Sequence, residues 1–190
     1  MKKVSAFLFL LLVFASSLVF TYHTPASFAQ PEQATIDEQV YFSPKGGCTE
    51  GIVKNLDVAE KYVLVQAYSF TSKPIAEALV NAHKRGVKVK VLLDKSQRHG
   101  KGSKLSLLVD AGISVSIDTK HSIAHNKVMI IDGVTVMTGS FNFTNAAEDK
   151  NAENLLVLHD KVVAKKYHDN WNKHQQHSEP YVVANIQERT

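Results

Sequence analysis

Residues 62–93 read YVLVQAYSFTSKPIAEALVNAHKRGVKVKVLL and give the clearest indication of the fold class. The run 62–68 is continuously β-rich and apolar, as expected of a strand that is buried on both faces. Pro74 then opens a helix that ends at Gly86, and 87–93 is a second buried strand. The helix places apolar residues on one face, namely Ile75, Ala78, Leu79 and Ala82. This order predicts a βαβ unit with parallel strands.

The same alternation continues on both sides of this unit. A short strand at 40–42 precedes a helix whose apolar positions are Ile52, Leu56 and Ala59. A helix at 105–111 and a strand at 113–117 follow. Three repeats of strand, helix and strand predict an α/β fold with a mixed, largely parallel sheet that carries helices on both faces.

The second half of the chain is patterned differently. The apolar runs 127–131 and 134–138 are joined by Asp132-Gly133, a strong signal for a tight hairpin. A further strand at 154–158 and a polar helix from Lys161 to about His177 complete the pattern. The hairpin is the reason to expect a mixed sheet.

The amino terminus resembles a secretory signal. Lys2 and Lys3 precede an apolar run at 6–20, and small residues stand before a cleavage site after Ala29. This run is shorter than the roughly 18–20 residues that span a bilayer, and an uncleaved anchor is the alternative. We predict a signal peptide at 1–29, a single catalytic domain at 30–190 and export to the periplasm or the medium, without stable membrane association.

The composition excludes several classes of protein. With 44% hydrophobic and 21% charged residues, the chain is neither collagen-like nor wholly disordered. Its single cysteine, Cys48, excludes an intrachain disulfide and a Cys-rich zinc module, and leaves either a buried thiol or a bridge between two chains. The net charge of +4 falls by two when Lys2 and Lys3 are removed, too little to indicate a nucleic-acid partner.

One part of the chain carries residues suited to catalysis: 125–132 reads HNKVMIID and 139–142 reads GSFN. Side chains two apart on a strand share a face, so His125 and Lys127 should project together. A two-residue hairpin loop would set the register so that His125 lies opposite Ser140. The same register places Lys127 opposite Thr138 and brings Asn142 to the shared face.

Such a cluster suits a phosphate group. The lysine offsets negative charge, neutral donors hold the oxygens, and an imidazole can attack phosphorus or protonate a leaving oxygen. The alternative is an ordinary solvated strand edge. Asp132 lies roughly 16 Å beyond Lys127 along an extended strand, so we predict that it shapes the turn instead of supporting the imidazole.

The spacing H-x-K-x4-D followed by G-S-x-N, with Glu153 downstream, resembles the phospholipase D superfamily over residues 35–175. The resemblance implies an α-β-α sandwich and a phosphohistidine mechanism that needs two such motifs. His125 would be the nucleophile in one chain and the acid in the other, with Lys127 and Asn142 on the phosphate. Ser140 and Glu153 would support them, and Glu153 would orient the imidazole. Asp132 and Gly139 would be structural members of the motif.

The sequence holds this motif once, so the resemblance implies a homodimer with one shared site and no cofactor or metal. Its length, export signal and single motif are most similar to a small bacterial endonuclease of that superfamily. We therefore predict non-specific hydrolysis of DNA, with RNA as a further substrate. A lipid phosphodiesterase and an inactive nucleic-acid-binding protein are the alternatives.

The remaining polar residues carry weaker signals. Residues 95–104 form a basic segment, in which Lys101 and Lys104 either bind phosphates of the substrate or belong to a solvated loop. We expect the histidines of the last helix, His168, His174 and His177, to be solvated, with metal binding as the alternative. We expect His121 to lie at the rim of the site. Tyr68 and Phe141 could stack on bases, but core packing is the preferred interpretation.

Overall fold

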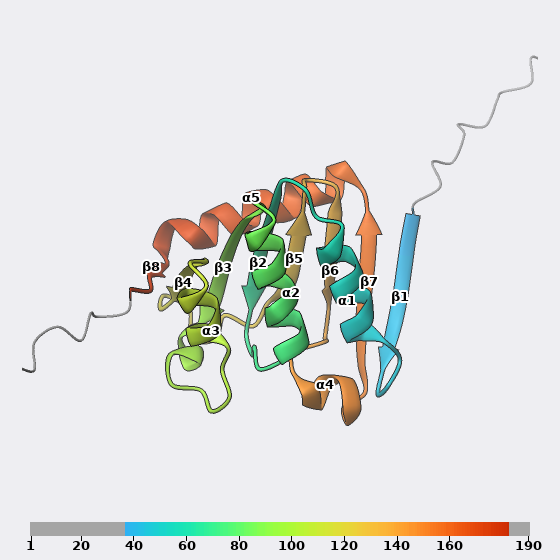
Figure 1. The fold of residues 1–190 in the computed structure, drawn as a ribbon, viewed down its shortest axis with the longest axis horizontal. Helices are drawn as coiled ribbons and strands as arrows, with labels where there is room; N and C mark the ends of the chain where they lie inside the picture. The colour runs from blue at the N-terminus through green and yellow to red at the C-terminus, as the bar shows by residue number, and fades with distance from the viewer. Residues whose placement is uncertain (1–36, 183–190) are drawn as a thin grey trace, which may run out of the picture. The chain divides into compact units, whose positions relative to one another are not determined.

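The computed structural model describes residues 37–182, so the predicted signal peptide lies outside the described residues. These residues form one eight-stranded sheet with helices (Figure 1). The strands are β1 (Asp37–Ser43), β2 (Tyr62–Ala67), β3 (Lys88–Asp94), β4 (Ser114–Asp118), β5 (Lys127–Ile131), β6 (Thr135–Gly139), β7 (Glu153–His159) and β8 (Glu179–Pro180). The helices are α1 (Cys48–Asp57), α2 (Lys73–Lys84), α3 (Leu105–Asp110), α4 (Asn145–Asp149) and α5 (Lys161–His177), with a 3₁₀ turn at Lys95–Arg98.

The sheet is mixed, as expected, but the prediction that it is largely parallel is wrong. The strand order is β1-β7-β6-β5-β2-β3-β4-β8, and only β2–β3 and β3–β4 pair in parallel. The other five pairings are antiparallel. The difference arises in part because β1 lies at the end of the sheet and pairs with β7, so it is not a neighbour of β2. The chain then returns through α1 to β2 in the centre of the sheet.

Helices cover both faces of the sheet, which confirms the α/β class with helices on both sides. The strand β2 shows why, because its residues alternate between two cores. Val63 and Val65 pack with Ile52 of α1 and Leu79 of α2. Leu64, on the opposite face, packs in a second cluster with residues of α5. Figure 1 shows α1 and α2 in front of the sheet and α5 behind it.

The long helix α5 is held by its single tryptophan. Trp171 is 2% exposed, and its Nε1 donates a hydrogen bond of 2.9 Å to the carbonyl oxygen of Val65 in β2. Truncation of such a buried tryptophan costs about 3–5 kcal/mol. The side chain therefore fixes α5 across the centre of the sheet. Among residues 37–182, no helix combines the length and apolarity needed to cross a membrane.

The β5–β6 hairpin differs from the predicted register by one residue. Ile131 pairs with Thr135, and Val128 pairs with Thr138, so the expected pairs His125–Ser140 and Lys127–Thr138 are wrong. Asp132 and Gly133 adopt φ of 54° and 71° and close the turn, but Val134 stays outside the ladder as an extra loop residue. Its carbonyl oxygen accepts a hydrogen bond from the Asp160 backbone at 2.9 Å, and this contact fixes the wider loop.

Strand directions bring the candidate residues together despite the shifted register. The strands β2, β3, β4 and β6 end at one edge of the sheet, and the antiparallel strands β5 and β7 begin there. This edge is the lower one in Figure 1, beside α4. The segments 125–127, 139–142 and 153–154 therefore lie along a single edge.

The single cysteine is the first residue of α1. Cys48 is 0% exposed, and burial, with a smaller contribution from the charge of Glu148, raises the pKa of its thiol to about 11. A thiol with these properties is inert toward oxidation. Of the two alternatives, the structure therefore favours the buried thiol over a bridge between chains.

Candidate active site

His125 and Lys127 form a close pair at this edge. Lys127 is 6% exposed, whereas His125 is exposed. The Lys127 Nζ donates a hydrogen bond of 2.8 Å to the His125 carbonyl oxygen and lies 3.0 Å from Nδ1 of the same residue. The arrangement therefore presents a histidine with a fixed positive charge beside it.

The charge on Lys127 is affected by two opposing influences. Burial lowers the pKa of its ammonium group, and the negative charge of Glu153 raises that pKa by a smaller amount. A buried cation is costly unless an anion compensates it. An incoming phosphate would supply such an anion, so the pair is suited to binding a phosphodiester.

Tyr68 is a site residue that the sequence analysis considered for base stacking but assigned to core packing. Its ring centroid lies 4.5 Å from that of His125, and the Lys127 Nζ lies 5.2 Å from the same aromatic ring. Its backbone N–H donates to the Asn126 carbonyl oxygen at 2.9 Å. The expectation of core packing is wrong for Tyr68, because the pairing of β2 with β5 places its ring against His125. The same expectation is confirmed for Phe141, which is 1% exposed.

The segment after β6 holds Gly139, Ser140 and Asn142 against the start of β7. A Cβ at Gly139, where φ is 151°, would lie 2.2 Å from the Asn154 carbonyl oxygen, so only glycine fits. The Ser140 Oγ accepts a hydrogen bond of 3.0 Å from the Asn154 backbone. The Asn142 Oδ1 is buried and has no partner within residues 37–182. Asn142 thus keeps hydrogen-bonding capacity that a ligand can use.

Glu153 lies at the same edge but has a different partner from the one expected. Its Oε1 accepts a hydrogen bond of 3.1 Å from Asn151, and its backbone N–H donates to the Ser43 Oγ at 3.2 Å. Within the described part of the chain it makes no hydrogen bond to His125. It acts on the site through its negative charge, which raises the pKa of Lys127.

Asp132 lies at the opposite end of β5, where it anchors the hairpin turn. Its carboxylate accepts hydrogen bonds from three consecutive backbone N–H groups, at 2.9 Å from Glu60 and 2.8 Å from both Lys61 and Tyr62. These contacts join the turn to the start of β2. The geometry gives Asp132 a structural task, far along the strand from His125.

The basic segment 95–104 lies next to the end of β2. The Phe70 backbone N–H donates to the Gln97 Oε1 at 3.1 Å, and the Phe70 carbonyl oxygen accepts from the Lys104 backbone at 3.0 Å. Phe70 is only two residues beyond Tyr68. Lys101 is exposed and Lys104 is half-buried, so both lie on a segment attached beside the His125 edge.

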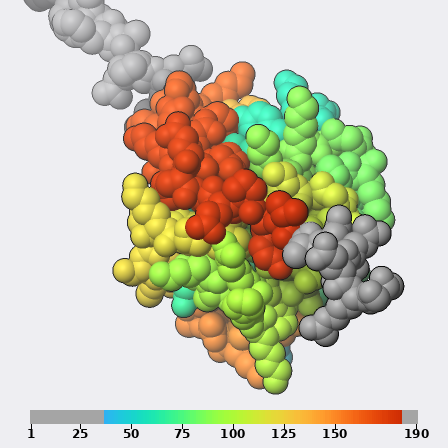
Figure 2. Space-filling model, turned by 90° about the vertical axis from the view of Figure 1, so that its left-hand side faces the viewer, coloured from blue at the N-terminus to red at the C-terminus, as the bar shows by residue number. Residues whose placement is uncertain are grey.

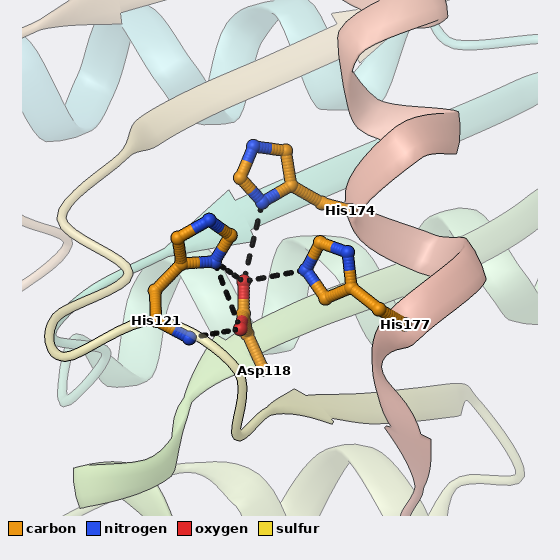
Figure 3. Close-up of side chains that lie close together, drawn as sticks. All are labelled: Asp118, His121, His174 and His177. Carbon is orange, nitrogen blue, oxygen red and sulfur yellow. Dashed lines mark hydrogen bonds and ion pairs between the residues drawn. The ribbon is translucent and has the colours of Figure 1, made fainter.

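The expected solvation of the last-helix histidines is wrong for two of the three. His174 and His177 have side chains only 16% and 21% exposed, and both approach the Asp118 carboxylate together with His121 (Figure 3). His168, at 37%, is more exposed. The spacings Asp118-x-x-His121 and His174-x-x-His177 were the sequence signal for this cluster, but their proximity depends on the packing of α5.

Comparisons with known proteins agree with this geometry. A family model described as cardiolipin synthase, PLD-like domain, matches residues 52–175. A phospholipase D of Rickettsia typhi is 48% identical over 144 residues, which cover 76% of this chain and 71% of that protein. A mitochondrial cardiolipin hydrolase of Xenopus tropicalis is 32% identical over 122 residues, covering 64% of this chain and 58% of that protein. The crystal structure of Nuc from Salmonella typhimurium, a phospholipase D family member, superimposes with a TM-score of 0.74 at 37% identity, covering 78% of this chain and 99% of that one.

Proposed function

Because this chain belongs to the phospholipase D superfamily of phosphodiesterases, we propose that it is an exported, metal-independent and non-specific endonuclease that hydrolyses DNA and RNA. The observation that carries the proposal is the exposed imidazole of His125 beside the buried ammonium group of Lys127, 3.0 Å away. This pair combines a nucleophile with the positive charge that a phosphodiester requires.

The proposed reaction has two steps. A neutral imidazole nitrogen of His125 attacks phosphorus, and the P–O bond to one nucleoside breaks as a second histidine gives its proton to the leaving oxygen. That second histidine then takes a proton from water, whose oxygen displaces the imidazole and restores the enzyme. Lys127 offsets the charge on the phosphate oxygens, and the amide N–H group of Asn142 donates a hydrogen bond to them. Since lysine supplies this charge, the chemistry needs no metal ion.

The second histidine is His125 of another copy of the chain, because the sequence carries the motif once. Two features support a shared site. His125 is exposed at the edge of the sheet, and Ile123, two residues earlier, is 56% exposed although it is apolar. Exposure of both side chains leaves this edge accessible to a second copy of the chain.

The basic segment supports nucleic acid as the substrate. Lys101 and Lys104 lie on a segment attached beside Tyr68, where they can follow the phosphates of a polynucleotide without reading its bases. A lipid phosphodiesterase is the second candidate, because relatives are named phospholipase D and mitochondrial cardiolipin hydrolase. An inactive binding protein is disfavoured, since binding alone requires no nucleophile.

The test is plasmid cleavage in excess EDTA by the wild-type protein, His125→Ala and the control His168→Ala. We expect cleavage by the wild type and the control, and a loss of at least about 100-fold in His125→Ala. Cleavage that EDTA abolishes while the protein stays folded would contradict the proposal, as would activity retained by His125→Ala. Turnover of cardiolipin or phosphatidylcholine without plasmid cleavage would favour the lipid substrate.

Subunit mixing tests the shared site. Wild-type protein is unfolded and refolded together with inactive His125→Ala protein at several ratios. If both histidines of a dimer are needed, activity falls with the square of the wild-type fraction. A linear fall, or a fully active monomer in sedimentation analysis, would refute the shared site.

A further inference from the structure

A second cluster of side chains lies apart from the His125–Lys127 pair. It combines the carboxylate of Asp118, the last residue of β4, with His121 from the following loop and His174 and His177 from the end of α5 (Figure 3). Each residue offers one ligand atom, and the four atoms lie within 4.8 Å of one another. The cluster therefore joins two segments that are distant in sequence, the end of β4 with the loop after it and the end of α5.

The distances around Asp118 are those of a compact coordination sphere. Its Oδ2 lies 2.9 Å from the His121 Nδ1, 3.2 Å from the His174 Nδ1 and 3.3 Å from the His177 Nε2. In a tetrahedral zinc site with ligands at 2.0–2.1 Å, ligand atoms are about 3.3 Å apart. Small rotations of the imidazole rings would thus bring all four atoms to coordination distance.

Hydrogen bonding alone satisfies this cluster poorly. The Asp118 oxygens also receive the backbone N–H groups of Lys120 and His121, at 3.1 and 3.2 Å, so five nitrogen atoms approach one carboxylate. A carboxylate has about four lone-pair sites. A cation between the four side chains would instead take the free lone pairs of neutral imidazoles and one carboxylate oxygen.

The surroundings are also appropriate for a metal ion. Asp118 is 1% exposed, and His174 and His177 are mostly buried, so water competes weakly for the ligands. The end of α5 is fastened beside β4, because the Gln175 Nε2 donates to the Ser116 Oγ at 3.2 Å. Figure 2 shows the end of α5 (orange to red) on the same face as the segments that follow β3 and β4.

From this geometry we propose that Asp118, His121, His174 and His177 form a binding site for a divalent transition-metal ion, with zinc as the best match. Three imidazoles and one carboxylate are typical zinc ligands. Four protein ligands fill a tetrahedral sphere, so the site is structural and leaves no open position for catalysis. The metal therefore takes no part in the proposed phosphoryl transfer.

The ion would stabilise the loop that carries the candidate nucleophile. This loop runs from Thr119 to Asn126, and it is already fixed at Ala124, whose N–H donates to the Asp94 carboxylate at 2.7 Å. Coordination of His121 adds a fixed point four residues before His125. Metal binding would thus join α5, β4 and the loop of the active site into one unit.

The test is metal binding by the untagged protein after removal of metal with a chelator. Zn²⁺ is titrated against a chromophoric competitor, and Co²⁺ is added separately to record the visible bands of tetrahedral coordination. Wild type and the control His168→Ala, on the same helix but outside the cluster, should bind about one ion per chain. His177→Ala should bind at least about 10-fold more weakly and lose the tetrahedral Co²⁺ spectrum.

Thermal unfolding gives a second readout that is independent of activity. Zn²⁺ should raise the Tm of wild type and His168→Ala but not that of His177→Ala. His174→Asn, with circular dichroism as a check on folding, separates loss of a ligand from loss of structure. Equal Zn²⁺ affinity in wild type and both cluster variants would overturn the proposal, as would a wild type that binds no Zn²⁺.

Discussion

Replacement of Asp132 by alanine separates a structural role from a catalytic one for the aspartate of the motif. Its carboxylate accepts three backbone hydrogen bonds, of which the one from Tyr62 is partly buried and those from Glu60 and Lys61 are exposed. Water can replace the carboxylate at the two exposed N–H groups but only incompletely at Tyr62. The substitution should therefore destabilise the fold without touching the reacting groups.

The expected loss follows from these contacts. A partly buried hydrogen bond to a charged acceptor contributes about 1.5 kcal/mol, and the two exposed ones contribute about 0.5 kcal/mol each after solvation. Asp132 also has φ of 54°, and alanine in this left-handed conformation costs about 1 kcal/mol more. The total is about 3.5 kcal/mol, which corresponds to a Tm lower by about 7–14 °C.

Urea unfolding and plasmid cleavage, the latter well below the Tm, measure the two roles separately. Asp132→Gly permits the positive φ but lacks the acceptor, so it should recover about 1 kcal/mol relative to alanine. Asp132→Asn keeps one acceptor oxygen and should lose the least. Folded Asp132→Ala should cleave within about threefold of wild type, whereas loss of a catalytic acid or base costs about 100-fold or more. A variant as stable as wild type, or folded but inactive, would refute the structural interpretation.

Three further predictions concern the edge of the sheet. Joint replacement of Lys101 and Lys104 by alanine should reduce, by about two, the slope of the logarithm of the DNA-binding constant against the logarithm of salt concentration, measured by fluorescence anisotropy. An unchanged slope would exclude phosphate contacts by these lysines. Burial lowers the pKa of Lys127 in the folded protein, so the unfolded chain binds more protons just below the ordinary lysine pKa. The free energy of unfolding of the wild type, relative to that of Lys127→Met, should therefore rise as the pH increases toward 10.5. A relative free energy from urea unfolding that falls over this pH range would contradict the prediction. Gly139→Ala should destabilise the protein by about 2–3 kcal/mol, because its Cβ would collide with the Asn154 carbonyl, and a neutral effect would show that this close approach can relax.

The sequence determined the elements and the residue types of the site. The apolar run 62–68 contains β2, which is covered on both faces, and the helical spacing of Ile75 and Leu79 corresponds to α2. The run 87–93 contains most of β3, whose Lys88 and Lys90 are exposed on one face. These are local properties, since a period of 2 or 3.6 residues reflects which side chains meet water. The family also followed from local spacing between His125, Lys127 and the later motif residues.

The sequence pattern did not predict the strand order or the hairpin register. Both depend on which distant segments pair, as the position of β1 beside β7 and the extra loop residue at Val134 show. The local energies of alternative pairings are similar. The consequence is a mostly antiparallel sheet. Its strand directions nevertheless bring the candidate residues to one edge of the sheet.

The contacts of the site were decided by tertiary structure as well. Tyr68 lies against His125 only because β2 pairs with β5, and the cluster around Asp118 exists only because Trp171 fixes α5 across the sheet. The spacing His174-x-x-His177 marks a pair of histidines, but it gives no local sign of the Asp118 carboxylate that they meet through the packing of α5. Residue types and local periodicity can be read directly from the sequence, whereas contacts between residues that are far apart in the sequence depend on the packing of the whole domain.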